Sequence, residues 1–451
     1  MDRVLKMGNY KLPMDLVIEI LARLPVKSLM RFKCVCKFFY DLIKSDNQFK
    51  DKHYGISKAK SDCVVLETGG ADVREYFFVH RESESNEIGC TYLDIPKRPI
   101  HWIKCCQGML CMISSKTARI QLVDVDYLVY DILIWNPSTR KVKALPSITF
   151  PNKLPNGTLV TTEFGFGISN DMTWKVVMLL EIGNLGEGER KFDQITMVYS
   201  QVHSDSWSLR EINSVPFVPP VQGRANDFYL KGRYYWNNVK SYYNHPYNEE
   251  LLFDIDHYKV LNKRYLIWFD MDDEVFGTIE LPSNFGYNEV RSITIMNETI
   301  ALVVRPSMED SEGYCIDIWL MIENDNNTYW HKQACIVNID HCGDYCRTLG
   351  IWNVGSQLLV FPDDIGTWDW RLFLGKRNIP YFISIDLVTR EKKTFYISRK
   401  RKSINNIDSN VDGYLQVYNE RNIDIKEEWK FSIFMFHSIH TRVFSESLYL
   451  L

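Results

Sequence analysis

Four side chains of the types that can ligate a metal ion lie close together in the sequence, at Cys335, His341, Cys342 and Cys346. Cys342 and Cys346 have a spacing that a zinc ion tolerates, but no second Cys-x2-Cys pair accompanies them, as most structural zinc sites require. Buried or strand-packed thiols are the commoner use of such cysteines. We therefore expect neither a metal ion nor another cofactor in this protein.

Grouped carboxylates are the second set of residues that could do chemistry. Asp124 with Asp126, and Asp270 with Asp272 and Asp273, have the residue type of general acid–base catalysts. Asp-rich turns between strands are far commoner, and no spacing here demands a convergent catalytic site. The sequence therefore indicates a protein that is not an enzyme, with a glycan- or ester-processing hydrolase as an alternative.

The chain of 451 residues divides into two parts of opposite charge. Residues 1–60 hold 13 Lys and Arg against 6 Asp and Glu, which gives +7, and residues 61–451 hold 40 against 51, which gives −11. All 12 Trp lie after residue 100, and 21 of the 23 Gly lie after residue 60. We therefore expect a basic head in residues 1–60, with its core at about 10–50, and a separate body in residues 61–451.

Targeting signals are sparse in this chain. The N-terminus lacks an apolar stretch long enough for a signal peptide, and no run of about 20 apolar residues is available to cross a bilayer. The 11 cysteines, an odd number without a secretory signal, indicate reduced thiols. We expect a cytoplasmic protein without membrane contact, and the basic run Arg399–Lys402 leaves nuclear import open.

The first helix of the head is predicted from Pro13 to Leu24. Proline suits a first helical turn, and the next proline along the chain, Pro25, ends the helix. The polar residues of this helix recur at every fourth position and form one narrow stripe, at Asp15, Glu19 and Arg23. A helix that is apolar on nearly all sides must be buried on most of them, against the body or against a partner's helices.

Two further helices are predicted in the head, one from about Ser28 and one through Phe39 to about Ser45. The Lys and Arg of this region are interleaved with core positions, and no recognition helix with Asn, Gln or Arg at successive turns is evident. We therefore do not expect the head to bind nucleic acid. A module of roughly 45 residues buries little on its own, so a protein partner is the favoured cover.

At these residues the chain resembles the F-box of plant F-box proteins. The most specific stretches are Leu24-Pro-Val-Lys-Ser-Leu29 and Arg31-Phe-Lys-Cys-Val-Cys-Lys37. The family usually has a tryptophan soon after that last lysine, where this chain has Phe38. The resemblance implies docking on an acidic Skp1-like adaptor, and through it on a cullin and a RING protein. The positions that match the family's adaptor-facing or core residues are Leu12, Pro13, Leu16, Ile20, Leu21, Leu24, Pro25, Leu29 and Val35.

The body is predicted to consist of repeated β-hairpins. An apolar strand, a polar turn and a second strand recur six times, and the copies begin on average about 61 residues apart, at 76, 132, 198, 265, 316 and 381. Between them lies a second pattern, an apolar hairpin around a glycine turn, at 106–111, 230–236, 353–360 and 411–415. Two hairpins per unit make the four strands of a propeller blade.

The predicted fold class is therefore α+β and multi-domain. A small all-α head precedes an all-β propeller-like body of about six to eight blades, and a two-sheet sandwich is the alternative. The repeated units resemble the kelch-like F-box-associated domain of plant F-box proteins, in the stretches Trp135–Arg140, Phe164–Gly167, Val198–Ser200 and Phe269–Met271. Within that family the chain is most similar to the S-locus F-box proteins of pollen, which are receptors for pistil ribonucleases in self-incompatibility.

Acidic stretches and an aromatic loop are the predicted target-binding surfaces of the body. A solvated acidic face is the simpler interpretation, but such a face also steers a basic protein by long-range attraction. The ribonucleases that the resemblance implies are often basic, which agrees in sign. The candidate residues are Asp270, Asp272, Asp273, Glu309, Asp310, Glu312, Tyr242 and Tyr243.

Together with these features, the resemblance implies a substrate-recognition subunit of an SCF-type E3 ubiquitin ligase. The head would dock the adaptor, and the body would hold a target whose lysines then lie near the charged conjugating enzyme, at high effective concentration. The alternatives are an interaction scaffold, whose head packs only on its own body, and the hydrolase already mentioned.

Overall fold

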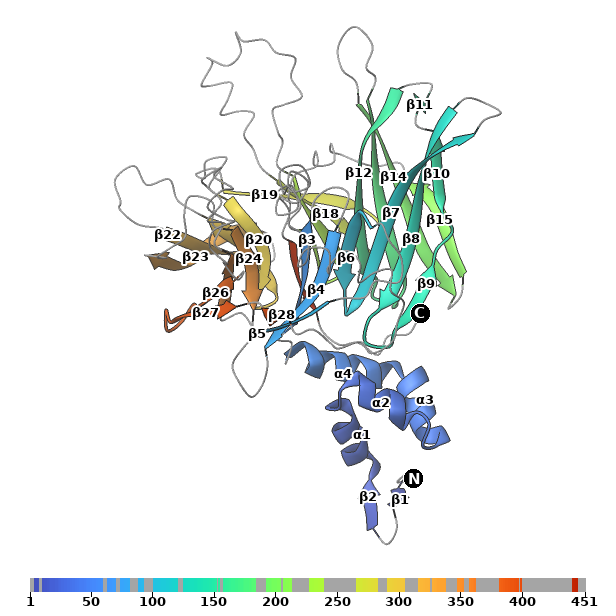
Figure 1. The fold of residues 1–451 in the computed structure, drawn as a ribbon, viewed down its shortest axis with the longest axis vertical. Coiled ribbons are helices and arrows are strands. Elements are labelled where there is room, and N and C mark those ends of the chain that lie inside the picture. Colours follow the sequence, from blue (N-terminus) through green and yellow to red (C-terminus); the bar gives the residue numbers. More distant parts are fainter. Residues whose placement is uncertain are drawn as a thin grey trace, which may run out of the picture.

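The computed structural model contains a small helical head and a larger β body (Figure 1). It describes residues 4–7, 10–59, 63–69, 74–81, 88–92, 100–120, 125–151, 153–154, 157–183, 192–203, 206–212, 227–238, 265–282, 290–304, 315–324, 327–337, 347–352, 357–361, 381–396, 398–399 and 440–444. In Figure 1 the helices gather below the sheets, and the thin grey trace marks the residues outside these ranges.

The head contains the helices α1 (Met14–Ala22), α2 (Val26–Phe32), α3 (Lys37–Ser45) and α4 (Asn47–Ala59). Pro13 and Pro25 stand directly before α1 and α2, where a fixed φ and a missing amide hydrogen do no harm. Helix α2 therefore begins two residues earlier than the predicted Ser28. A short hairpin, β1 (Val4–Met7) with β2 (Tyr10–Pro13), precedes the helices.

Helix α4 is not among the predicted elements, because its apolar side chains are few and Gly55 interrupts them. The helix begins after Asp46, whose carboxylate accepts a hydrogen bond from the Phe49 amide at 2.9 Å and so caps the first turn. Phe49 itself is buried. It completes a core whose other buried members are Val17, Leu21, Ala22, Val26, Leu29, Phe39, Leu42 and Ile43.

Six mainly antiparallel sheets follow one another along the described part of the body. The first contains β3 (Cys63–Gly69), β4 (Arg74–Arg81), β5 (Ile88–Tyr92), β28 (Ser398–Arg399) and β29 (His440–Phe444). The second contains β6 (Trp102–Cys106), β7 (Met109–Ile120), β8 (Val125–Asn136), β9 (Lys141–Ala144) and β10 (Ile148–Pro151). The third contains β11 (Lys153–Leu154), β12 (Gly157–Ile168), β13 (Trp174–Gly183), β14 (Phe192–His203) and β15 (Ser206–Ile212).

The remaining three sheets have four strands each and the same sequential order. The fourth contains β16 (Phe228–Leu230), β17 (Arg233–Asn238), β18 (Tyr265–Asp270) and β19 (Phe276–Glu280). The fifth contains β20 (Val290–Met296), β21 (Thr299–Val304), β22 (Cys315–Asn324) and β23 (Asn327–Val337). The sixth contains β24 (Arg347–Trp352), β25 (Gln357–Phe361), β26 (Tyr381–Asp386) and β27 (Lys392–Tyr396).

This succession of small sheets confirms the predicted propeller-like body over the two-sheet sandwich. The six predicted repeats are the later hairpins of the sheets, β4–β5, β8–β9, β14–β15, β18–β19, β22–β23 and β26–β27. Three of the predicted glycine hairpins are earlier hairpins, β6–β7, β16–β17 and β24–β25, while 411–415 lies outside the described residues. In the β6–β7 turn Gln107 has φ 44° and Gly108 φ 72°, the backbone that two-residue hairpin turns require.

The two ends of the body meet in one sheet. Strand β29 pairs antiparallel with β3, so that His440 lies opposite Glu67 and Phe444 opposite Cys63. The last described strand of the chain thereby covers the edge of the first strand of the body. Such pairing leaves β3 with no open edge on that side and closes the succession of sheets.

One turn is repeated in three of the later hairpins. The side chains of Asn136, Asp270 and Asp386 each accept hydrogen bonds from the amides two and three residues further on, at 2.8–3.2 Å. The fourth residue after each has positive φ: Arg140, Glu274 and Arg390. An Asn or Asp side chain can replace a backbone carbonyl as the acceptor in a turn, which explains why Asn or Asp ends each of these three strands.

Candidate functional site

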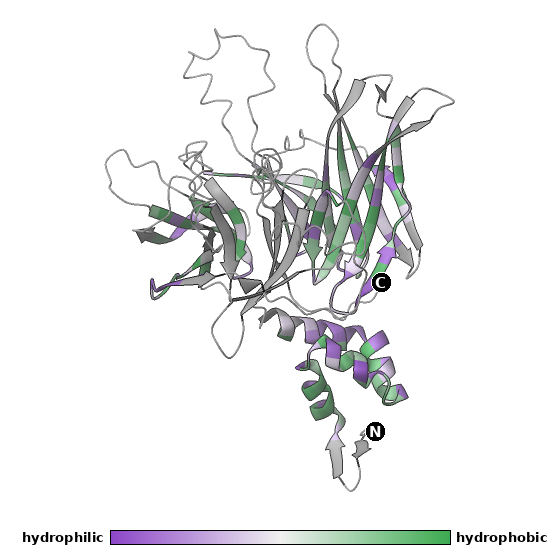
Figure 2. Ribbon diagram, viewed as in Figure 1, coloured by the Kyte–Doolittle hydropathy of each residue, from purple (hydrophilic) through white to green (hydrophobic). Residues whose placement is uncertain are grey.

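Helix α1 presents two apolar faces with different surroundings. Val17 and Leu21 point into the head core, whereas Leu16 and Ile20 are 53% and 56% exposed. Leu16 and Ile20 are one turn apart and therefore lie side by side on the helix surface. Figure 2 shows the hydrophobic colouring of α1, and Figure 1 shows that α1 lies on the side of the head away from the body. We call Leu16 and Ile20 the apolar stripe.

The nine predicted adaptor positions separate into exposed and buried sets. Pro13, Leu16, Ile20, Pro25 and Val35 are exposed, Val35 by 62%. Leu24 is half-buried, whereas the side chains of Leu21 and Leu29 lie in the core and support the surface from beneath. The side chain of Leu12 lies outside the described residues, although its backbone belongs to β2. The sequence alone does not make this division, because both sets are apolar.

Helix α4 holds α1 in place through polar contacts. The His53 imidazole Nε2 lies 3.0 Å from the carbonyl oxygen of Leu24, and Lys52 forms an ion pair with Glu19. Glu19 also pairs with Arg23, one turn along α1, as its spacing predicts. The hydrogen bond from Lys52, followed by that from Arg23, holds the pKa of Glu19 below its ordinary value.

A small basic and aromatic patch is formed by α3 and the residue after α2, Lys33. The Lys44 ammonium donates a hydrogen bond of 2.7 Å to the Tyr40 hydroxyl, and the Lys33 ammonium lies 5.4 Å from the ring centre. The hydrogen bond with Tyr40 raises the pKa of Lys44, which keeps the lysine charged. Tyr40 is 41% exposed, so the patch combines positive charge with an accessible ring and matches an acidic partner.

The head contacts the body through α4. Tyr54 is partly buried against the body core that the second and third sheets form, which includes Met109, Phe164 and Trp174. In Figure 1 this helix lies between the sheets and the rest of the head. The contact leaves α1 on the side of the head away from the sheets (Figure 1).

The acidic target candidates differ in how free their side chains are. Asp270 is committed to its own turn and to Arg233, whose guanidinium donates a hydrogen bond of 3.1 Å to the carboxylate. Asp272 is exposed but accepts a hydrogen bond of 2.7 Å from the Asn170 amide of the third sheet, and Asp273 is exposed. Lying outside the described residues are the other candidates, Glu309, Asp310, Glu312, Tyr242 and Tyr243.

Two buried ion pairs between the sheets are not evident from the sequence. Lys104 of β6 pairs with Asp227, just before β16, and their side chains are 6% and 5% exposed. The Tyr234 hydroxyl donates a second hydrogen bond of 2.6 Å to Asp227. Lys175 of β13 and Glu274 of the β18–β19 turn lie 2.8 Å apart. These charges face one another inside the body, and each pair joins two sheets.

Two thiols and a carboxylate meet between β22 and β23. Cys315, Asp317 and Cys335 place their ligand atoms within 4.8 Å of one another. Burial, followed by the hydrogen bond with Cys335, raises the pKa of Cys315 to about 12. Cys335 belongs to the sequence cluster first considered for zinc, whereas His341, Cys342 and Cys346 lie outside the described residues. The register brings Cys315 to Cys335, from 20 residues away.

None of the helices in the described ranges combines the length and the apolar character that a bilayer span requires.

Comparison with known proteins gives two family matches. The F-box domain matches residues 10–51, and the F-box associated beta propeller domain matches residues 77–418. One relative, an F-box protein of Arabidopsis thaliana, is 24% identical over 352 residues, which cover 73% of each chain. An F-box/kelch-repeat protein of the same plant is 31% identical over 189 residues, which cover 38% of this chain and 46% of the relative.

Among solved structures, a periplasmic gluconolactonase of Pseudomonas aeruginosa is similar with a TM-score of 0.33 and 10% identity, over 74% of this chain and 82% of the other. That likeness is too distant to bear on function. The F-box associated beta propeller match spans most of the chain, and it coincides with the sheets described above. The chain therefore belongs to the plant F-box proteins that carry an F-box associated beta propeller domain after an N-terminal F-box.

Proposed function

We propose that this protein is the substrate-recognition subunit of an SCF-type E3 ubiquitin ligase. Its head docks a Skp1-like adaptor, and through it a cullin and a RING protein, while its body holds the target. The observation that carries the proposal is the apolar stripe, Leu16 and Ile20, exposed on an F-box helix whose other face forms the core.

The surroundings of the stripe favour a protein partner over intramolecular packing. The described residues include nine exposed large hydrophobic side chains, and four of them, Leu16, Ile20, Val35 and Tyr40, belong to the small head. Exposed apolar side chains gathered on one module mark an interaction site. The body contacts α4 and leaves α1 uncovered, which argues against the scaffold whose head only packs on its own body.

Within this proposal the protein is itself non-catalytic, and it acts by holding target lysines at high effective concentration. We place the boundary between the two domains near residue 60, between the end of α4 at Ala59 and the start of β3 at Cys63. The cytoplasm, with nuclear entry, is the compartment that suits the proposed assembly.

The test is adaptor binding by the Leu16→Asp/Ile20→Asp double variant. Both side chains already face solvent, so the variant is expected to melt within a few degrees of the wild type. Two carboxylates in the centre of an apolar interface should weaken binding at least about 100-fold. Co-purification with a Skp1-like adaptor at low and high salt measures the effect, because salt screens charge pairs and leaves apolar burial intact.

A matched control is Val388→Asp, which places the same charge at an 81% exposed apolar side chain of the body. This variant is expected to bind the adaptor like the wild type. A wild-type complex that forms at neither salt concentration would overturn the proposal, as would a double variant that binds at full strength. Global unfolding of the double variant would instead show that the stripe is needed for the fold and favour the scaffold.

For the target we propose a basic protein of the class of the pistil ribonucleases. The support is the similarity to S-locus F-box proteins at the sequence level and the exposed carboxylates of Asp272 and Asp273. Capture of such a ribonuclease by the body, weakened by salt and by Asp272→Asn/Asp273→Asn, is the expected result. Binding that ignores both changes would reject the acidic surface as the target site.

A further inference from the structure

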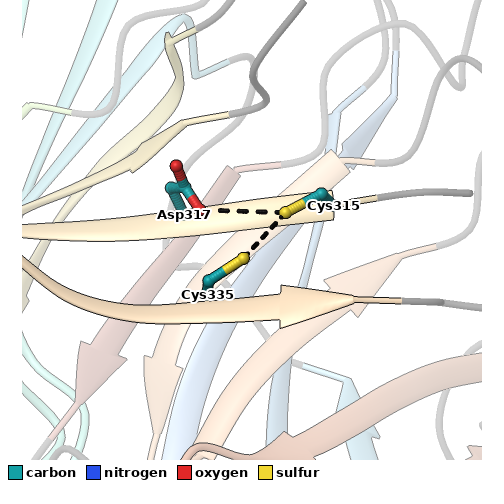
Figure 3. Close-up of side chains that lie close together, drawn as sticks. All are labelled: Cys315, Asp317 and Cys335. Carbon is teal, nitrogen blue, oxygen red and sulfur yellow. Dashed lines mark hydrogen bonds between the residues drawn. The ribbon is translucent and has the colours of Figure 1, made fainter. Parts of the chain in front are cut away.

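The pairing of β22 with β23 places two thiol sulfurs and one carboxylate close together on one face of the fifth sheet (Figure 3). Asp317 lies opposite Cys335, and Cys315 is two residues before Asp317 on the same strand, so all three side chains share a face. The two Sγ atoms are 3.0 Å apart, and the Cys315 Sγ lies 3.8 Å from the Asp317 Oδ1.

The register argues against a direct bond between the two sulfurs. A disulfide needs Cβ atoms about 3.5–4.5 Å apart. Cys315 lies opposite Val337 and diagonal to Cys335, and Cβ atoms in diagonal pairs are farther apart than in opposite pairs. A tetrahedral ion with metal–sulfur bonds of about 2.3 Å needs the two sulfurs roughly 3.8 Å apart, so binding requires side-chain rotations that separate the Sγ atoms from their present 3.0 Å.

The carboxylate of Asp317 is already oriented toward the thiols. The Lys332 ammonium, from β23, pairs with Oδ2 of Asp317 at 2.6 Å, while Oδ1 of Asp317 faces Cys315. Asp317 is only 5% exposed and Cys315 6%. Carboxylates that ligate metal ions are commonly held by a second residue through one oxygen while the other oxygen faces the ion. Lys332 holds Asp317 in this way.

A divalent cation that replaces the two thiol protons would leave the net charge of this cluster unchanged, because Asp317 and Lys332 already balance each other. Two thiolates and one carboxylate carry three negative charges, and Lys332 neutralises one of them. A divalent ion neutralises the other two, so the site stays neutral in an environment where net charge is costly.

We propose that Cys315, Asp317 and Cys335 bind a thiophilic divalent metal ion of the zinc class. Each thiol gives its proton to solvent as its metal–sulfur bond forms, and Asp317 adds one oxygen ligand through Oδ1. A tetrahedral ion would complete its coordination with water. The site ties β22 to β23, and Arg390 of the sixth sheet donates a hydrogen bond to the Cys335 carbonyl, so the ion would stiffen the junction of two sheets.

The experiment uses cobalt(II) as a spectroscopic probe, added to the full-length reduced protein. Cobalt–thiolate coordination gives an intense near-ultraviolet charge-transfer absorbance that carboxylates and imidazoles do not give. The expected result is saturable absorbance that zinc displaces and that the Cys315→Ser/Cys335→Ser variant loses. The matched control is Cys34→Ser/Cys36→Ser in the head, which should keep the absorbance unchanged.

A second variant separates ligation from folding. Asp317→Asn keeps both thiols and should retain the charge-transfer absorbance with at least about tenfold weaker cobalt binding. Unchanged affinity in this variant, or unchanged absorbance in the double cysteine variant, would overturn the site. A wild-type chain that takes up no cobalt after reduction, and whose oxidised form is lighter by two hydrogens through a Cys315–Cys335 bond, would replace it with a disulfide pair.

Discussion

At the scale of single residues, Asp270 shows how a candidate binding group turns out to be structural. Burial by itself would raise the pKa of Asp270, but the Asp272 and Asp273 amides and the Arg233 guanidinium outweigh that effect and hold the pKa below its ordinary value. Asn136 makes the same two backbone contacts in the second sheet. Asp270 and Asn136 therefore share one role, which is to accept hydrogen bonds from two backbone amides of a turn. An uncharged side-chain oxygen is sufficient for this role.

The turn predicts different outcomes for two substitutions of Asp270. Asp270→Ala leaves two amides without their acceptor and should lower the free energy of unfolding by about 1–3 kcal/mol. Asp270→Asn should cost less than about 1 kcal/mol, because only the ion pair with the partly exposed Arg233 is lost. Urea unfolding of the two variants measures the difference.

The same residue predicts a pH dependence. Because the folded-state pKa of Asp270 is depressed, its contribution is present above the unfolded-state pKa of about 3.9 and is lost as the pH falls through the lower folded value. The stability difference between the wild type and Asp270→Asn should therefore shrink below about pH 4. A difference that widens on acidification would contradict this account.

At the scale of elements, helix α1 combines a core face with an exposed apolar face. Its apolar residues surround most of the helix, yet Val17 and Leu21 meet the other head helices, whereas Leu16 and Ile20 remain exposed. Helix α4 adds Phe49 to the core that buries Val17 and Leu21, and its Lys52 pairs with Glu19 on another side of α1. An element that is missing from the prediction therefore contributes to burying the core face of a predicted one.

This division predicts opposite effects for two leucines on one helix. Leu21→Ala opens a cavity in the head core and should destabilise it by about 2–5 kcal/mol, whereas Leu16→Ala should change its stability by less than about 0.5 kcal/mol. Hydrogen exchange of peptides from α1 to α4 measures the head separately from the body. Equal protection in the two variants would mean that the two faces are assigned wrongly.

At the scale of the whole molecule, the succession of sheets depends on a pairing between the ends of the body. Strand β29 adds to β3, so the first sheet combines segments from the start and the end of the body. The head packs on this body through Tyr54, which is partly buried against the core of the second and third sheets.

Closure predicts that a backbone change in β29 destabilises the body. Val443 lies opposite Val64, and Val443→Pro removes an amide hydrogen and imposes a fixed φ, at a cost of roughly 3 kcal/mol where that amide is paired. Val443→Thr keeps the amide and a β-branched side chain, and it is the matched control. Thermal unfolding followed by tryptophan fluorescence reports on the body, because all 12 Trp lie after residue 100.

A melting temperature that Val443→Pro leaves unchanged would argue that β29 contributes nothing to closure. The proposed adaptor-binding stripe, Leu16 and Ile20, should keep its affinity in both variants.

The sequence by itself determines the local elements of this protein. The prolines at 13 and 25 and the apolar spacing between them predict α1, and the alternation around Asn136, Asp270 and Asp386 predicts the later hairpins of their sheets. These features depend on neighbours within a few residues, so the period of the apolar positions records them directly. The basic head and the acidic body are equally visible, because charge is a sum over residues.

Only the tertiary structure decides which of these residues meet. The exposure of Leu16 and the burial of Val17, the capture of Asp270 by its own turn, and the approach of Cys315 to Cys335 depend on partners that arrive from other segments. Helix α4, which lacks a strong apolar period, is stabilised by the core that it completes. The local sequence pattern determines the period at which side chains along an element are buried. Strand register and helix packing determine which neighbouring residues bury each side chain.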